Sequence, residues 1–157
     1  MNTTIRYLQK SDLPHLEKLL RPMWLLHATQ EEDFIKRKSL QDIELNRYFA
    51  KSLNKRNEFA LIALYGNKIV GVIRVEKVRL EDFFKIRTVY YLDDLVIEKK
   101  HRRQGIATML VKEVKKIAKK NNIKGLKTRT YEFNKTAIKF LESVELKKLY
   151  SEYYSKL

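Results

Sequence analysis

The sequence contains no cysteine, few glycines and prolines, and no long run of apolar residues. The lack of cysteine in 157 residues excludes disulfides, thiolate zinc sites and a covalent acyl-cysteine intermediate. An enzyme built from this chain must therefore work without a thiol nucleophile. No stretch reaches the roughly 18 apolar residues of a membrane helix, and the first residues lack the pattern of a secretion signal. We therefore expect a cytoplasmic protein with no membrane partner.

Metal and triad chemistry also lack their usual signatures. The three histidines, His15, His27 and His101, never fall at metal-ligand spacing. Neither a Gly-x-Ser-x-Gly elbow nor a Walker-type Gly-Lys-Ser/Thr motif occurs in the sequence. We therefore expect no metal cofactor and no hydrolase triad.

The chain has only four glycines and two prolines, and it shows no low-complexity linker or internal repeat. Nothing in the composition marks a domain boundary. A chain of 157 residues can bury one sizeable core, and its 44% hydrophobic and 34% charged residues are typical of a globular protein. The sequence predicts one domain over residues 1–157.

Positive charge is in clear excess. The formal net charge is +15, from 34 basic and 19 acidic residues. Ten lysines and arginines lie between residues 98 and 124, against only Glu98 and Glu113. Such a surplus attracts nucleic acid, acidic surfaces or a phosphorylated cofactor, although charge runs are also common on solvated faces.

Apolar periodicity predicts the element order βααβββαβαβ. A first helix follows Ser11 or Asp12, and a Gly66-Asn67 turn joins two strands of a hairpin. The predicted strands cover 4–8, 59–65, 69–78, 87–97 and 126–131, with a final strand or hairpin over 146–154. The other predicted helices cover 31–53, 105–120 and 134–143.

The most informative segment is a strand, 91–97, followed by a basic turn that leads directly into an amphipathic helix. The turn reads Arg102-Arg103-Gln104-Gly105-Ile106-Ala107. A helix N-terminus presents about four unpaired N–H groups and a partial positive charge, which together favour phosphate oxygens. Gly105 lets this backbone approach a ligand closely because it has no Cβ. The pattern predicts a phosphate site at this turn.

These residues resemble the GNAT superfamily of acetyl-CoA-dependent N-acetyltransferases. The family signature Arg/Gln-x-x-Gly-x-Gly/Ala is matched by Arg102, Gly105 and Ala107. The Asp93-Asp94 pair looks like the acidic dipeptide of polyamine and amino-sugar members. Further along the chain, Asn134, Ala137 and Phe140 resemble the family's Asn-x-x-Ala-x-x-Phe helix. The resemblance is specific over residues 91–143 and only architectural before them.

The resemblance implies an α/β fold with a mixed, largely antiparallel sheet of about six to seven strands. Such a sheet is splayed between its fourth and fifth strands and flanked by about four helices. The resemblance also implies that acetyl-CoA binds along the strand and over the turn, with the main chain of Leu95 and Ile97 pairing with the pantetheine arm. The implied cofactor-binding residues are Leu95, Val96, Ile97, Arg102, Arg103, Gln104, Gly105, Ile106, Ala107, Thr108 and Asn134.

The acceptor amine must be neutral to attack a thioester, so a carboxylate near the strand is the natural general base. Asp93 is our candidate. Strand alternation predicts that Asp93 and Asp94 point to opposite faces, so that one of them is structural. Burial on an apolar strand would raise the pKa of the base, which suits this role.

Several positions keep two interpretations. Leu141 stands where many family members have a tyrosine that protonates the leaving thiolate, so that Tyr131, Tyr150, Tyr153, Tyr154 or solvent must replace it. Asn134 is either a helix N-cap or a cofactor contact, and both roles are compatible. Trp24 and His27 either line an acceptor pocket or belong to the core, and a tryptophan at helical spacing favours the core.

The predicted function is acetyl transfer from acetyl-CoA to a primary amine of a small molecule or peptide, in a ternary complex. One alternative is a basic module that binds nucleic acid or the ribosome, through Lys112, Lys115, Lys116, Lys119 and Lys120. No aromatic stacking motif or helix-turn-helix pattern supports that alternative. Another is a non-catalytic acyl-CoA sensor, which Leu141 suggests. The tyrosine-rich end, 150–154, could supply a homodimer interface.

Overall fold

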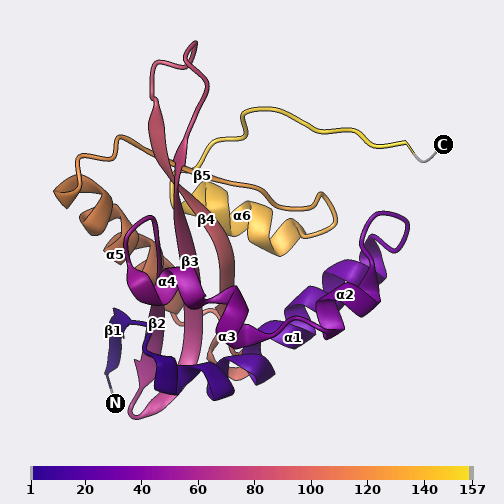
Figure 1. The fold of residues 1–157 in the computed structure, drawn as a ribbon, viewed down its shortest axis with the longest axis vertical. Helices are drawn as coiled ribbons and strands as arrows, with labels where there is room; N and C mark the ends of the chain where they lie inside the picture. Colours follow the sequence, from indigo (N-terminus) through magenta and orange to yellow (C-terminus); the bar gives the residue numbers. More distant parts are fainter. Residues whose placement is uncertain (1, 156–157) are drawn as a thin grey trace.

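Five strands form one sheet in which every strand lies beside its neighbour in sequence (Figure 1). The structure, a computed structural model, describes residues 2–155. The strands are β1 (Thr3–Tyr7), β2 (Glu58–Tyr65), β3 (Lys68–Arg79), β4 (Thr88–Ile97) and β5 (Gly125–Thr128). The first three pairings are antiparallel, and β4 pairs with β5 in parallel. The expected mixed, largely antiparallel sheet is confirmed, with five strands among the described residues in place of six to seven.

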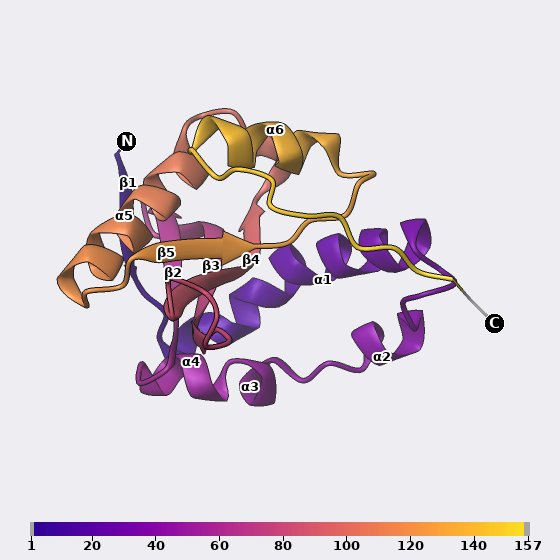
Figure 2. The same cartoon turned by 90° about the horizontal axis from the view of Figure 1, so that it is seen from above.

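Helices cover both faces of the sheet (Figure 2). The helices α1 (Leu13–Gln30), α2 (Arg37–Gln41), α3 (Leu45–Tyr48) and α4 (Ala50–Asn54) lie on one side. The helices α5 (Ile106–Lys120) and α6 (Lys135–Ser143) lie on the other. Short 3₁₀ turns, Lys10–Asp12 and Lys99–His101, precede α1 and α5.

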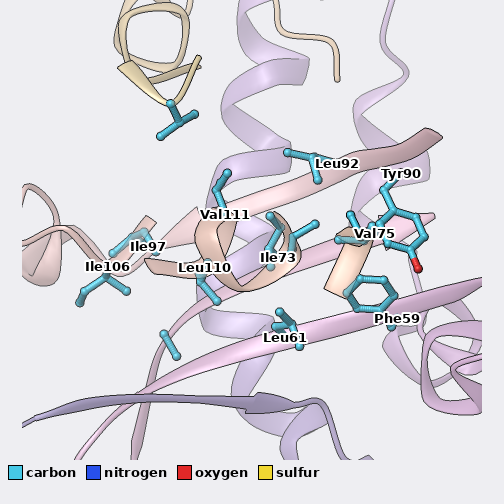
Figure 3. Close-up of a cluster of buried hydrophobic side chains, with 14 of the residues drawn as sticks. Phe59, Leu61, Ile73, Val75, Tyr90, Leu92, Ile97, Ile106, Leu110 and Val111 are labelled. Atoms are coloured by element: carbon cyan, nitrogen blue, oxygen red, sulfur yellow. The ribbon is translucent and has the colours of Figure 1, made fainter. Parts of the chain in front are cut away.

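The sheet separates two apolar cores. On one face, side chains of the central strands pack against Ile106, Leu110 and Val111 of α5 (Figure 3). On the other face, Leu16, Leu20 and Trp24 of α1 pack with apolar side chains of α3, β2 and β3. Burial of the apolar stripes of α1 and α5 therefore fixes both helices on the sheet, because apolar surface leaves water there.

The long second helix predicted over 31–53 is wrong. The chain instead forms three short helices, α2, α3 and α4. Its apolar residues do not keep helical spacing, since only Leu40 falls between Ile35 and Ile43. Arg21 of α1 binds the carbonyls that α2 leaves free, at 2.8 Å from Leu40 O, 2.6 Å from Gln41 O and 3.2 Å from Ile43 O. Tertiary contacts thus replace helical hydrogen bonds in this segment.

The final strand predicted over 146–154 is also wrong, since the described residues contain no strand after β5. This C-terminal segment runs in an extended path away from the body of the molecule (Figure 1). Its aromatic side chains stay largely exposed, with Tyr153 93% exposed. Only isolated contacts hold it, including Tyr154 against Phe34 and Lys127 over the Tyr150 ring. High β propensity does not produce a strand where no buried face is available.

Candidate active site

The strand β4 has two halves that differ in their neighbours. It pairs with β3 along nearly its whole length, whereas β5 accompanies it only from Val89 to Leu92. At the end of this pairing, Thr128 Oγ1 donates a hydrogen bond to Leu92 O at 2.7 Å. Beyond it, residues 93–97 have no β5 partner. The expected splay between the fourth and fifth strands is therefore present.

The main chain at the end of β4 faces the open side of this splay. Glu98 N–H donates to Val70 O of β3 at 2.8 Å, so the neighbouring Ile97 points its polar groups away from β3. Ile97 O accepts a hydrogen bond from Arg102 Nε at 3.0 Å. Gly71 of β3 leaves room for the Ile97 side chain here, because a Cβ at this position would lie 2.6 Å from Ile97 Cδ1 and 3.3 Å from Val96 O. Leu95 lies two residues before Ile97 and has the same orientation by strand alternation.

The basic turn between β4 and α5 has an unusual backbone. Arg103 and Gly105 have positive φ angles of 60° and 77°. Gly105 is the N-cap of α5, and a Cβ added there would meet no atom within 4 Å. The first helical bond of α5 is donated by Met109 N–H to Gly105 O at 2.9 Å. The space next to Gly105 is therefore open.

The main-chain N–H groups of residues 103–108 make no hydrogen bond to any residue in the range 2–155. They form an uninterrupted run of donors at the N-terminus of a 15-residue helix. The helix dipole adds a partial positive charge at this end, and the exposed side chains of Arg102 and Arg103 add two full charges. Such a run of amides suits a diphosphate.

The other predicted residues of the turn divide by exposure. Gln104 is exposed, Ala107 and Thr108 are half-buried, and Ile106 is buried in the core, so that only its main chain faces the turn. A groove of about 250 Å³ begins beside Thr108 and runs between α5 and the end of α6. Lys112 and Lys115 line this groove as well.

The expectation that Asp93 and Asp94 point to opposite faces is wrong. Val75 pairs with Leu92 and Ile73 pairs with Leu95, so Arg74 alone lies opposite both aspartates. This is a β-bulge, in which two residues of one strand face one residue of the other. The bulge shifts the alternation, and the hydroxyl of Tyr48 consequently lies 2.6 Å from Asp94 Oδ2 and 3.4 Å from Asp93 Oδ2. Both carboxylates therefore lie beside the same hydroxyl group.

Asp94 is buried, and both of its oxygens are occupied. Trp24 Nε1 donates to Oδ1 at 2.9 Å, and Tyr48 donates to Oδ2. Burial raises the pKa of Asp94, and the charge of Asp93 adds to this effect, while the two hydrogen bonds oppose it. Burial and the two nearby carboxylates also raise the pKa of Tyr48 well above its ordinary value, so this hydroxyl remains protonated.

Asp93 has one free oxygen. Its Oδ2 binds Arg74 of β3, whereas Oδ1 makes no hydrogen bond within the part of the chain that the structure describes. The Arg74 guanidinium also donates to Glu58 Oε2 of β2 at 3.1 Å and to Tyr48 Oη at 3.0 Å. Of the two aspartates, only Asp93 can therefore contact an acceptor directly.

Sequence reasoning did not identify Tyr48, Arg74 and Glu58 as site residues. The signal for Arg74 was present, because it is a lone charge between Ile73 and Val75 in an otherwise apolar strand segment. A charge at such a position needs a partner of opposite charge nearby. Tyr48 had no comparable signal, since it lies in the segment that was predicted as one long helix.

Trp24 and His27, which lie three residues apart on α1, have different surroundings. Trp24 is 6% exposed and belongs to the core, which agrees with the expectation for a tryptophan at helical spacing. The centroid of the His27 ring lies 5.3 Å from that of the Tyr131 ring and 5.6 Å from that of the Phe133 ring, and both of these residues follow β5. Burial lowers the pKa of His27. His27, Tyr131 and Phe133 thus form an aromatic cluster that joins α1 to the segment between β5 and α6.

Asn134 is the N-cap of α6, because its Oδ1 accepts a hydrogen bond from Ala137 N–H at 3.1 Å. The structural interpretation of this residue is therefore confirmed. Its possible contact with a cofactor stays a prediction.

The lysines of α5 are partly neutralised. Lys115 pairs with Glu145 and Lys116 with Glu113, both at 2.9 Å.

Within residues 2–155, no three potential ligand side chains gather where they could hold a metal ion. No helix in the same range is both long enough and apolar enough to cross a bilayer.

The fold matches that of several solved structures, two of which are aminoglycoside acetyltransferases. A tetramutant of the BH1408 protein from Bacillus halodurans superimposes with a TM-score of 0.87 at 18% identity, over 98% of this chain and 99% of that one. Aminoglycoside N-acetyltransferase AAC(6')-Iy in complex with CoA gives a TM-score of 0.78 at 15% identity, over 99% and 95% of the chains. The aminoglycoside acetyltransferase meta-AAC0020, from an uncultured soil metagenomic sample, gives 0.68 at 22% identity, over 99% and 96%. No curated protein sequence matches the chain.

The sequence itself identifies the family. The model of the acetyltransferase (GNAT) family matches residues 16–144. The chain therefore belongs to this family, and it is an acetyl-CoA-dependent acyltransferase. The resemblance based on Arg102, Gly105 and Ala107 is confirmed.

Proposed function

We propose that residues 1–157 form a single N-acetyltransferase domain that transfers an acetyl group from acetyl-CoA to a primary amine. The acceptor is a small molecule or a peptide, and transfer is direct within a ternary complex. One observation carries this proposal: the unbonded amides of residues 103–108 lie at the end of the same strand that holds Asp93. The acetyl donor and the proposed base, Asp93, are thereby brought to one edge of the sheet.

The turn fits the diphosphate of acetyl-CoA. The amides of residues 103–108 supply donors, Arg102 and Arg103 supply charge, and the space beside Gly105 is open. The solved structure of AAC(6')-Iy contains CoA on the same fold, which supports a CoA site here. In this proposal Thr108 and Asn134 complete the cofactor-binding set at the start of α5 and α6.

The open half of β4 fits the extended pantetheine arm. An extended chain adds to a sheet where strand N–H and C=O groups lack a neighbour, as they do beyond Leu92. Leu95 and Ile97 present these groups, with Val96 between them. Arg102 holds Ile97 O, so the Leu95 main chain and the Ile97 N–H are the groups that remain for the arm.

Asp93 is proposed as the general base. Its free Oδ1 takes a proton from the acceptor ammonium, which leaves a neutral nitrogen able to form the new amide bond. Acetyl-CoA supplies the activated acyl group, and its thioester bond breaks as the amide bond forms. CoA leaves as a thiolate, which is protonated to the free thiol, while the nitrogen loses its second proton. No thiol of the chain can carry the acetyl group, because the chain has no cysteine. Direct transfer is the mechanism that remains.

Two measurements on the purified chain test this function. Calorimetry with acetyl-CoA should give a dissociation constant in the micromolar range, and a panel of amines should include at least one that releases CoA in the presence of acetyl-CoA. Absence of acetyl-CoA binding would contradict the cofactor site. Binding without CoA release from any amine, amino acid or peptide terminus would instead favour the sensor. Salt-dependent RNA binding unaffected by acetyl-CoA would favour the nucleic-acid module.

A further inference from the structure

The charged groups around the bulge are arranged about one largely buried cation. Arg74 has a side chain only 12% exposed and contacts Asp93 and Glu58, while Asp94 lies next to Asp93 on the bulge. Glu58 has a second, exposed cation, Lys51, whose Nζ lies 4.0 Å from its Oε1, whereas Arg74 is the cation that contacts Asp93. An arginine of this kind holds its neighbours in fixed geometry, because its planar fork donates in defined directions.

Glu58 fixes the guanidinium from the side away from Asp93. Glu58 is 4% exposed and lies at the start of β2. Its Oε2 accepts a hydrogen bond from Arg74 Nη2 at 3.1 Å and lies 3.4 Å from Ser52 Oγ of α4. The Tyr48 ring supports the same group, with Arg74 Cζ 4.5 Å from the ring centroid. Glu58 at the start of β2 and Tyr48 of α3 thus hold Arg74 in place.

The Tyr48 hydroxyl has a defined direction because it has only one proton. It accepts a hydrogen bond from Arg74 Nη1 at 3.0 Å and donates one to Asp94 Oδ2 at 2.6 Å, its shorter contact. Together with the Trp24 bond, this occupies both oxygens of Asp94. Arg74 thereby secures one aspartate directly and the other through Tyr48.

We propose that Arg74 is a positioning residue for acetyl transfer: held by Glu58, it binds Asp93 Oδ2 and the Tyr48 hydroxyl together, so that Asp93 Oδ1 alone receives the acceptor's proton. This inference rests on the proposed function of Asp93. Removal of Arg74 would leave two adjacent carboxylates without their cation and would free Tyr48 to donate to Asp93 instead. The first effect shifts the deprotonation of Asp93 to higher pH, and the second changes which Asp93 oxygen is left for the acceptor.

The test compares Arg74→Gln with Arg79→Gln, a matched loss of charge from the exposed end of the same strand. We expect Arg74→Gln to lower kcat about 10–100-fold, the size of effect that a small misplacement of a catalytic group produces. The acidic limb of its kcat profile should move upward by about one pH unit, because a carboxylate pair without a cation holds protons more tightly. Acetyl-CoA affinity should stay within about twofold, since Arg74 lies away from the turn; Arg79→Gln should change none of these quantities.

Arg74→Lys separates charge from geometry. A lysine restores one positive charge but cannot reach Asp93, Glu58 and Tyr48 at once. We therefore expect the acidic limb to return to the wild-type position while kcat recovers only in part. An Arg74→Gln enzyme with an unchanged acidic limb, and a loss of kcat no larger than that of Arg79→Gln, would overturn the inference.

A titration that does not depend on turnover completes the test. The groups that face Asp93 are Arg74 from β3, Tyr48 from α3, and Asp94 and Tyr91 from β4. Carboxyl-¹³C NMR of the wild type, assigned with Asp93→Asn, follows the two aspartates directly. Upward movement of their titration midpoints in Arg74→Gln supports the inference, and unmoved midpoints overturn it. If the wild type acetylates no amine, the proposed function fails, yet this titration still decides the role of Arg74.

Discussion

The two halves of β4 belong to one strand but differ in their neighbours. From Val89 to Leu92 the strand is paired on both sides, and its side chains are largely buried in the core. From Asp93 to Ile97 it keeps only β3, contains a bulge, and leads into the turn with the unbonded amides. The first half is held by neighbours on both sides, whereas the groups suited to binding and catalysis gather where pairing is incomplete. The following predictions test this division.

The largest effect is expected at the turn. Gly105→Glu places a negative side chain in the open space before α5, and we expect acetyl-CoA affinity to fall about 100-fold or more because like charges repel. Calorimetry measures the loss. Gly105→Asn is the matched control, since asparagine tolerates positive φ and adds no charge. Equal affinities for Gly105→Glu and the wild type would mean that no phosphate binds there.

At the bulge we expect a large effect on turnover alone. Asp93→Asn keeps an oxygen for Arg74 but removes the proton acceptor, and kcat should fall about 10²–10³-fold. Steady-state kinetics give kcat, and calorimetry should show an unchanged acetyl-CoA affinity. Asp94→Asn should reduce kcat less, because Asp94 has no oxygen free for a substrate. The reverse order would assign the base to Asp94.

In the paired half we expect the opposite pattern. Leu92 is 3% exposed, and Leu92→Ala should lower the free energy of unfolding by about 2–5 kcal/mol through the cavity it leaves. Urea denaturation measures this change. Acetyl-CoA affinity of the folded variant should stay as in the wild type. Leu95→Ala, in the open half and only half-buried, should cost less stability.

The buried charge at the bulge predicts a pH effect on stability. The pKa of Asp94 is raised in the folded state, so the native protein binds this proton more tightly than the unfolded chain does. This contribution is full below the unfolded-state pKa of about 3.9 and is lost as the pH rises through the folded-state value. The free energy of unfolding of Asp94→Asn, relative to that of the wild type, should therefore be higher at pH 7 than at pH 4. Denaturation at both pH values measures the difference, and equal differences would contradict it.

The smallest effect is expected next to the splay, at α6. Asn134→Ala removes the N-cap bond and should cost about 1 kcal/mol of stability. Thr136→Ala, two residues further along the chain at an exposed position of α6, is the control. If affinity for acetyl-CoA falls as well, Asn134 also contacts the cofactor. Unchanged affinity would limit its role to capping.

The turn and the strand order were predictable because they depend on local signals. Gly105 in a basic segment before an amphipathic helix is visible in the sequence, and so is the run of β-branched and aromatic residues in β4. The bulge was not predictable from alternation, because it appears only when β4 is aligned with Arg74 of β3. The same reason explains Tyr48: its place beside Asp94 depends on the short helices after α1, which Arg21 stabilises from a distant part of the chain.

Gly71 has a consequence for how this enzyme could vary. Its missing side chain allows β3 and the last residue of β4 to lie in contact, directly behind the edge proposed for the pantetheine arm. A single added methyl group would meet the end of the Ile97 side chain at 2.6 Å, which would have to turn aside, and would lie 3.3 Å from Val96 O, so that the backbone of that edge would have to give slightly. A substitution at Gly71 could therefore alter the affinity for acetyl-CoA, although Gly71 lies outside the proposed binding site.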